Sequence, residues 1–347
     1  MLDDLNVLSQ RDPEDALGVA AQLYKQAGYA GDLVDADHDG RVLKNIIVTG
    51  MGGSALAADF AKVLLSSSLT VPFEVVKGYT LPASATHDTL VIASSHSGNT
   101  EETIECMNTA IERGCQMAAI ATGGKVKEIA AAHHVMFGEI PHDTQPRMGM
   151  IYNLRVLLRI LMAYGLIKDD LYAEMTRCAG WLQTESELWA KTVPTERNYA
   201  KQLALLSVGK TPVFYAGNLM APVAYKWKIS WNENAKNVAF WNYLPEFNHN
   251  EFLGWTSHPV EKPFAVFDLV SELEHPRVLK RFELSDRLLS GKRPKSTVVP
   301  LQGGSLLQQM LWASILADFA SIYVGILNGV DPTKVELIEK FKQELAA

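Results

Sequence analysis

Short apolar runs alternate with amphipathic stretches along the first part of the chain. The apolar runs cover residues 45–48, 73–76, 89–93, 118–121 and 134–137, and the amphipathic stretches cover residues 55–66, 99–113 and 126–132. A run of four or five apolar residues is typical of a buried strand, whereas apolar residues spaced three or four apart are typical of a helix. Strands that alternate with helices form βαβ units, so we expect a parallel sheet with helices on both faces.

The same alternation returns in the second half of the chain. We expect strands at residues 213–216, 238–241, 264–269 and 297–301, and helices at residues 221–233, 277–290 and 306–327. Each half opens with a strand, a glycine-containing turn and a helix, which indicates an internal duplication. The expected domains are an N-terminal extension (1–44) with a helix at 14–26, a first α/β domain (45–150), a helical connector (151–195) and a second α/β domain with C-terminal helices (196–347).

Composition places the chain among soluble globular proteins. Hydrophobic residues make up 48% of the 347 positions and charged residues 20%, which suffices for two domains with sizeable cores. The most apolar stretch, residues 306–327, contains Gln308, Gln309 and Asp318, so we expect a core helix rather than a membrane span. The opening residues M-L-D-D lack the basic region of a secretion signal, and a cytoplasmic location is expected.

Cysteine content and charge argue against several kinds of site. Cys106, Cys115 and Cys178 are odd in number and show no C-x-x-C spacing, so neither a disulfide framework nor a zinc site is predicted. The pair His133-His134 has no third ligand at metal spacing, and no metal is expected. A net charge of −7 without any basic run argues against nucleic-acid binding.

The densest group of hydroxyl side chains, S-S-H-S-G-N-T-E-E-T at residues 94–103, lies between a predicted strand and a predicted helix. The carboxyl ends of strands are where α/β sheets bind ligands. Ser95, Ser97 and Thr100 offer hydroxyl groups, Gly98 allows the backbone to approach closely, and the free N–H groups of the helix favour an anion. These features predict a phosphate-binding turn. A plain helix cap at Thr100 is the alternative, although a cap needs only one hydroxyl.

A second glycine-rich turn, G-M-G-G-S-A at residues 50–55, also follows a predicted strand. Both turns are therefore expected on the same edge of the first sheet. The second turn also fits the G-x-G-x-x-A variant of a dinucleotide-binding motif, with Glu74 about twenty residues further on. However, Glu74 falls at the start of the next strand, whereas the ribose-binding acid belongs at its end, so a nucleotide-dependent dehydrogenase is the weaker hypothesis.

Three further residues are candidates for chemistry. Arg147 follows the last strand of the first sheet near the start of a helix. A positive charge there is unfavourable unless a nearby anion compensates it. Glu233 is expected at a helix C-terminus, where the dipole disfavours a carboxylate, which suits a general base. His249 lies between two asparagines in a stretch rich in aromatic residues, as in a part-buried site. Each also has a structural interpretation, as a surface arginine, a helix cap or a satisfied histidine.

Together with Q-P-R at 145–147, N-E-N-A-K at 232–236 and F-N-H-N-E at 247–251, the two turns resemble the double sugar-isomerase-domain (SIS) proteins, above all the bifunctional phosphoglucose/phosphomannose isomerases. The motifs occur in the same order from about residue 45 onwards. The resemblance implies two flavodoxin-like αβα sandwiches with parallel sheets. It also implies an enzyme that converts glucose 6-phosphate, and mannose 6-phosphate, to and from fructose 6-phosphate through a cis-enediolate.

The resemblance further implies a role for each candidate. The phosphate would be held by Gly52, Gly53, Ser54, Ser95, Ser97, Gly98 and Thr100. Arg147 would stabilise the enediolate, Glu233 would move a proton between C1 and C2, and His249 would open the sugar ring from the partner subunit of a homodimer. Lys342 would assist at the ring oxygen, with Lys340 left open as the alternative. Chemistry of this kind requires no metal or redox cofactor.

A non-catalytic sugar-phosphate-binding regulator stays open as the alternative to an enzyme, since isomerase-type domains also serve in regulators. Such regulators usually carry a DNA-binding helical module, and no clear basic helix-turn-helix is apparent in this acidic chain. No motif decides the relative use of the glucose and mannose epimers.

Overall fold

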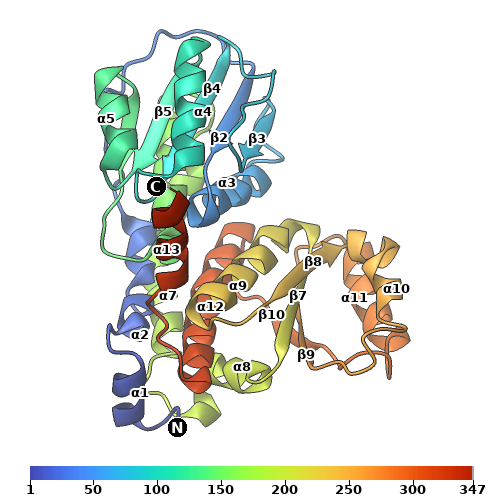
Figure 1. The fold of residues 1–347 in the computed structure, drawn as a ribbon. Coiled ribbons are helices and arrows are strands. Elements are labelled where there is room, and N and C mark those ends of the chain that lie inside the picture. Colours follow the sequence, from blue (N-terminus) through green and yellow to red (C-terminus); the bar gives the residue numbers. More distant parts are fainter. Residues whose placement is uncertain (346–347) are drawn as a thin grey trace. The chain divides into compact units, whose positions relative to one another are not determined.

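The computed structural model describes residues 1–345, and the chain divides into two compact units. The six-stranded unit comprises residues Leu23–Gln183 and Leu306–Gln308, and the four-stranded unit comprises Met1–Gln22, Thr184–Ser305 and the chain from Gln309 onwards. Each unit is built around its own sheet, and Figure 1 shows the elements of both.

The six-stranded unit is a layered α/β structure. Its strands are β1 (Leu33–Val34), β2 (Asn45–Thr49), β3 (Phe73–Val76), β4 (Thr89–Ser95), β5 (Gln116–Ala121) and β6 (Met136–Glu139), in the order β1-β6-β5-β4-β2-β3. The strands β2 to β6 pair in parallel, and only β1 runs antiparallel to its neighbour. The order β3-β2-β4-β5-β6 is the 2-1-3-4-5 order of flavodoxin-like sheets, as expected from the sequence.

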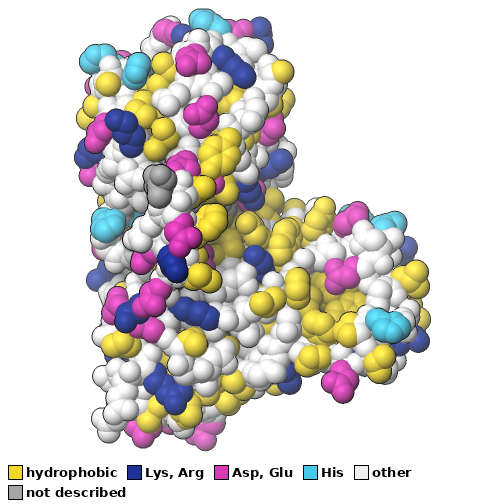
Figure 2. All heavy atoms as spheres, viewed as in Figure 1, with side chains coloured by type: hydrophobic (Ala, Val, Ile, Leu, Met, Phe, Trp, Pro, Cys, Tyr) yellow, Lys and Arg dark blue, Asp and Glu magenta, His cyan; other side chains and the backbone are white. Residues whose placement is uncertain are grey.

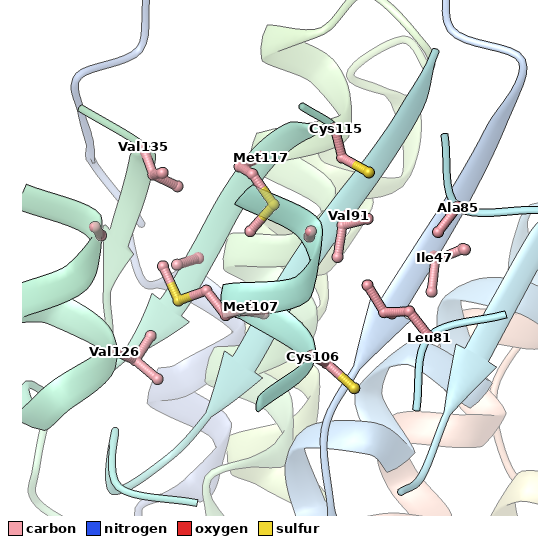
Figure 3. Close-up of a cluster of buried hydrophobic side chains, with 14 of the residues drawn as sticks. Ile47, Leu81, Ala85, Val91, Cys106, Met107, Cys115, Met117, Val126 and Val135 are labelled. Carbon is pink, nitrogen blue, oxygen red and sulfur yellow. The ribbon is translucent and has the colours of Figure 1, made fainter. Parts of the chain in front are cut away.

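Helices cover both faces of this sheet. They are α3 (Gly52–Leu64), α4 (Glu101–Glu112), α5 (Gly124–Ala132), α6 (Met150–Ala163) and most of α7 (Asp170–Glu187), with the 3₁₀ helices η1 (Leu23–Gly28) and η2 (Pro146–Met148). One face packs on α4 and α5 through a buried cluster that includes Ile47, Val91, Met107 and Val126 (Figure 3). The other face packs on α3 and α6. All seven residues of β4 are buried, because it lies in the middle of the sheet with helices on both sides.

The four-stranded unit repeats this design. Its strands are β7 (Thr211–Gly217), β8 (Phe240–Leu244), β9 (Phe264–Val270) and β10 (Thr297–Pro300), all parallel, in the order β10-β9-β7-β8. Its helices are α1 (Leu5–Arg11), α2 (Ala16–Ala20), α8 (Tyr199–Ser207), α9 (Ala221–Asn234), α10 (Glu251–Gly254), α11 (Pro276–Leu288), α12 (Leu306–Asn328) and α13 (Glu336–Leu345), with the 3₁₀ helices η3 (Thr195–Arg197), η4 (Asn218–Met220) and η5 (Glu246–His249). Read from the edge strand, β8-β7-β9-β10 has the same 2-1-3-4 order as β3-β2-β4-β5, which supports the predicted duplication.

Alternate residues of β7 serve the two faces of the second sheet. Phe214 packs against Trp227 and Trp231 of α9, with ring centroids 5.4 and 4.9 Å away. Its neighbour Tyr215 belongs to the opposite cluster, which includes Phe282 of α11. This two-residue period is what a strand buried on both faces produces.

A buried ion pair joins α9 to α12. Lys226 Nζ lies 2.6 Å from Asp318 Oδ1, with both side chains 2% exposed or less, and Ser230 Oγ donates to the same carboxylate oxygen at 2.9 Å. Helix α12 is long and apolar enough to cross a membrane by length and composition, but 94% of its most apolar window is buried inside the structure. It is therefore the core helix that the sequence predicted.

On the face shown in Figure 2, acidic and basic side chains are interspersed rather than gathered in large patches of one sign.

The structure corrects the expectation of one helix over residues 14–26. The segment forms the short helix α2 and the 3₁₀ helix η1, separated by two residues. At the break, Gln22 N–H bonds to the carbonyl of Val19, three residues back, so the turn is tighter than α-helical. Strand β1 was also missed, because two residues are too few to show a hydrophobic period.

Candidate functional site

The two predicted turns lie at adjacent strand ends of the six-stranded sheet. Strands β2 and β4 pair in register, with Thr49 opposite Ala93, so the turns that follow them start side by side. A Cβ on Gly50 would come within 2.7 Å of Ser94 O, and His96 N–H donates to Ser54 Oγ at 3.0 Å. The expectation that both turns share one edge of the first sheet is confirmed.

Two hydroxyl groups of the serine turn (residues 94–100) are bonded to each other. Ser95 Oγ and Thr100 Oγ1 lie 2.8 Å apart, and Gly98 N–H donates to Ser95 Oγ at 3.1 Å. Thr100 holds the N-cap position of α4, but its side chain makes no hydrogen bond to the helix backbone. The simple-cap alternative therefore does not describe this turn. Ser97 and Asn99 are exposed at its surface, whereas Ser95 and Gly98 are buried beneath.

A third turn, which the sequence analysis did not connect with the site, supports the serine turn. Gly98 has φ +71, and a Cβ there would lie 1.8 Å from the carbonyl oxygen of Gly123, so no other residue fits without rearrangement. Asn99 Oδ1 accepts a hydrogen bond from Lys125 N at 3.0 Å. Nothing in the sequence around the Gly123-Gly124 pair signals this packing role.

Arg147 lies on η2, directly before α6, and is 2% exposed. Its turn packs on the glycine turn, because a Cβ on Gly53 would come within 2.5 Å of Pro146 O. The six-stranded unit thus brings together three segments that are distant in sequence, namely residues 50–54, 94–100 and 144–149. Glycine backbone, the buried hydroxyl groups of Ser54 and Ser95, and the turn that carries buried Arg147 meet where the strands end, and this arrangement suits an anion.

Glu233 lies near the end of α9 in the four-stranded unit and lines a hollow of about 890 Å³. The walls of the hollow come from α9, from residues 236–240 leading into the start of β8, and from the segment before and at the start of α13, and include Val238, Phe240, Val335 and Ile338. Lys236 Nζ donates to the carbonyl of Glu233 at 2.9 Å, which caps the helix end. The predicted position of Glu233 at a helix C-terminus is confirmed.

His249 closes η5, after the end of β8, and its side chain is exposed. The hollow with Glu233 lies at the beginning of β8, so the strand separates the two residues. Five residues of β-strand span about 16 Å. Glu233 and His249 of one chain are therefore at opposite ends of the second sheet.

Lys340 and Lys342 both lie on α13, which has no buried residue. Lys340 Nζ is 3.7 Å from Glu344 Oε1, and both side chains of this pair are exposed. No group of three or more His, Cys, Asp or Glu side chains within residues 1–345 is arranged to hold a metal ion.

Glu274 is a buried acidic residue near a strand end that was not among the candidates from the sequence. Its side chain is 3% exposed, and Oε1 accepts hydrogen bonds from the N–H groups of Leu219 and Met220 at 2.9 and 3.2 Å. It thus occupies the β7–α9 turn, the counterpart in the second sheet of the glycine turn after β2. Burial raises the pKa of this carboxyl to about 7, against two backbone hydrogen bonds that lower it. In the second sheet a carboxylate of the protein itself lies where the first sheet offers an open turn.

The two α/β units with flavodoxin-like strand order, together with two family models, define the class of the protein as one with two SIS domains. A family model described as "SIS domain" matches residues 41–163, and one described as "Bacterial phospho-glucose isomerase C-terminal SIS domain" matches residues 196–345. A glucose-6-phosphate isomerase like protein from Thermus thermophilus has the same fold, with a TM-score of 0.65 at 19% identity over 99% of this chain and 98% of that one.

Relatives of known name narrow the class to a family. The bifunctional phosphoglucose/phosphomannose isomerase of Aquifex aeolicus is 34% identical over 87% of this chain and 90% of its own length. The enzyme of the same name from Caldicellulosiruptor bescii is 34% identical over 88% of this chain and 90% of its own. The chain belongs to the bifunctional phosphoglucose/phosphomannose isomerase family, and it is an isomerase rather than a regulator.

Proposed function

We propose that this isomerase interconverts glucose 6-phosphate and mannose 6-phosphate with fructose 6-phosphate in the cytoplasm. The observation that carries the proposal is the meeting of the serine turn, the glycine turn and the turn of buried Arg147 at the strand ends of the six-stranded unit. The names of the Aquifex aeolicus and Caldicellulosiruptor bescii relatives support the same substrates.

The substrate's phosphate binds at the serine turn in this proposal. Exposed Ser97 and the N–H groups at the start of α4 meet the phosphate, while Ser95 and Thr100 hold the turn in shape through their mutual hydrogen bond. The glycine turn adds Gly52, Gly53 and Ser54. Because the phosphate does not react, its binding energy positions the sugar carbons for the chemical step.

Glu233 is the proposed base that carries a proton between C1 and C2, and Arg147 stabilises the enediolate formed in between. An aldose and its ketose differ only in the positions of hydrogens, so one carboxylate can remove the proton from one carbon and return it to the other. A buried guanidinium stabilises the oxyanion more strongly than an exposed one, because water screens it less. Lys342 is proposed to assist ring opening, with Lys340 as the alternative.

His249 is proposed to act from the second copy of a homodimer. The support is its separation from Glu233 by the length of β8 in the same chain, which prevents both from contacting one hexose. Two copies related by a two-fold axis would each supply His249 to the other's site.

Substitution of the proposed base is the direct test. Glu233→Gln removes the proton acceptor and keeps the side-chain size, and we expect kcat for fructose 6-phosphate to fall about 10²- to 10⁴-fold while binding of inorganic phosphate persists. The matched control is Glu112→Gln, which changes an exposed glutamate at the end of α4. Glucose 6-phosphate is measured with a coupled dehydrogenase, and turnover of Glu233→Gln within about threefold of the wild type would remove Glu233 from the mechanism.

Complementation tests the shared site. Glu233→Gln and His249→Asn are each inactive in the proposal, but a heterodimer of the two has one intact site. After unfolding and refolding of an equal mixture, about a quarter of the wild-type activity is expected. If the mixture stays as inactive as its components, His249 acts within its own chain or not at all.

A further inference from the structure

His96 lies in the middle of the serine turn, yet its side chain points inwards and is 5% exposed. Its backbone is already engaged, because its N–H donates to Ser54 Oγ at 3.0 Å and its carbonyl accepts from Thr122 N–H at 3.0 Å. The main chain of His96 therefore holds the turn, and the imidazole is available for a different contact.

The imidazole contacts both ends of the segment that carries Arg147. At one end, Nε2 lies 3.2 Å from the carbonyl oxygen of Thr144. At the other end, a Cβ on Gly149 would lie 2.7 Å from ring atoms Cε1 and Nδ1, so the ring is in close contact with that backbone. Since a carbonyl oxygen only accepts hydrogen bonds, Nε2 carries the hydrogen and donates it.

The surroundings of the ring favour its neutral form. Burial lowers the pKa of His96, and the nearby His142 ring, 6.4 Å away, lowers it further, whereas the Thr144 hydrogen bond and Asp143 act in the opposite direction. Among the described residues, neither His96 Nδ1 nor Thr144 Oγ1 has a hydrogen-bond partner, although both atoms are buried. Buried polar atoms without partners are uncommon and call for an explanation at the site where they occur.

We propose that His96 is a positioning residue that couples the phosphate-binding serine turn to the Arg147 turn. Through its backbone it fixes Ser54, and through its ring it holds residues 144–149, so a phosphate bound at the serine turn also sets the position of the guanidinium. The catalytic part of this inference rests on the proposed isomerase function, whereas the mechanical link between the turns does not.

Two variants separate the hydrogen bond from the packing. His96→Leu keeps an apolar side chain of similar reach but has no donor for Thr144 O, and His96→Gln offers an amide N–H near the place of Nε2. We expect His96→Leu to lower kcat about tenfold to a hundredfold, with the inhibition constant of inorganic phosphate changed less than about threefold, because the phosphate contacts remain while Arg147 is displaced. His96→Gln should recover kcat to within about threefold of the wild type. The matched control is His133→Leu, an exposed histidine at the C-terminal end of α5.

A double-mutant cycle tests whether His96 acts through Arg147. If it does, His96→Leu should lower kcat little further in an Arg147→Met background, where the guanidinium is already gone. The proposal is overturned if the two substitutions lower kcat by the product of their separate effects. It is also overturned if His96→Leu weakens phosphate binding as much as it lowers kcat, or if His96→Gln does not restore kcat.

Hydrogen exchange tests the mechanical link without activity. In His96→Leu, the amides of Met148 and Gly149 should exchange faster, while those of α5 should not change. Thermal unfolding shows whether each variant folds, and His96→Ala, which removes both the donor and the ring, replaces His96→Leu if the latter does not fold. A wild-type protein that fails to turn over hexose phosphates would refute the proposed function alone, whereas unchanged exchange at residues 148–149 would refute the positioning role alone.

Discussion

The buried carboxyl of Glu274 predicts an unusual dependence of stability on pH. A glutamate has a pKa near 4.5 in an unfolded chain, and burial raises the pKa of Glu274 to about 7 in the folded protein. Its Oε1 accepts two backbone hydrogen bonds, but its buried Oε2 has no partner among the described residues. The structure therefore holds this carboxyl more easily with a proton than without one.

The sign and size of the effect follow from proton linkage. Below pH 4.5 both the folded and the unfolded chain carry the proton, and Glu274 costs nothing. Between pH 4.5 and about 7 the unfolded chain loses the proton first, so the free energy of unfolding falls as the pH rises. The difference in pKa corresponds to about 3 kcal/mol, and the loss is complete above pH 7.

Glu274→Gln isolates this contribution. Glutamine stays neutral, keeps the size of the side chain and can still accept hydrogen bonds from Leu219 and Met220. We expect the variant to match the wild type near pH 4.5 and to be more stable by up to about 3 kcal/mol at about pH 8. Glu272→Gln, two residues earlier and exposed, changes the net charge equally and serves as the control.

Urea unfolding at half-unit steps from about pH 4.5 to about 8.5, followed by tryptophan fluorescence, measures the difference. The signal reports the four-stranded unit, because Trp227 and Trp231 lie in its core. If the unfolding free energies of Glu274→Gln and the wild type differ by a constant amount over this range, the carboxyl does not titrate as its burial requires. A rise of the same size in Glu272→Gln would assign the effect to net charge.

Two further predictions concern buried contacts. Asp318→Asn removes the carboxylate that pairs with buried Lys226, so the free energy of unfolding in urea should fall by about 3 to 5 kcal/mol. The double variant Lys226→Met/Asp318→Leu leaves no charge unpaired, so its unfolding free energy should fall less than that of Asp318→Asn. Gly98→Ala places a Cβ against Gly123 O at a φ of +71, so the affinity for phosphate, measured by calorimetry, should fall at least about tenfold. The control is Gly180→Ala on α7, where a Cβ meets open space, and its phosphate affinity should equal that of the wild type.

Much of the fold was predictable because its signals are local. The apolar runs of β2, β4 and β9 and the glycine turns that follow β2 and β7 are short stretches whose character is visible in a few neighbouring residues. The repeated succession of strand, turn and helix then implied two parallel sheets. The position of Ser95, Ser97 and Thr100 at a strand end followed from the same pattern.

The support of the site was not predictable in this way. In the sequence, His96 is one of several polar residues in the turn, and its contact with Thr144 joins positions 48 residues apart. The close approach of Gly98 to Gly123 and the hydrogen bonds from Leu219 and Met220 to Glu274 likewise join residues from different turns. No periodicity encodes such pairs, because each depends on how whole strands are ordered in the sheet.

The sequence by itself therefore determined most of the segments that form strands and helices, and which turn carries the hydroxyl groups. Only the tertiary structure decided that Arg147 is buried against the glycine turn, that Glu233 and His249 lie at opposite ends of β8, and that a carboxylate occupies the β7–α9 turn. The physical reason is range: backbone preferences and amphipathic periods act over a few residues, whereas burial and hydrogen bonding between distant segments arise only when the sheets are assembled.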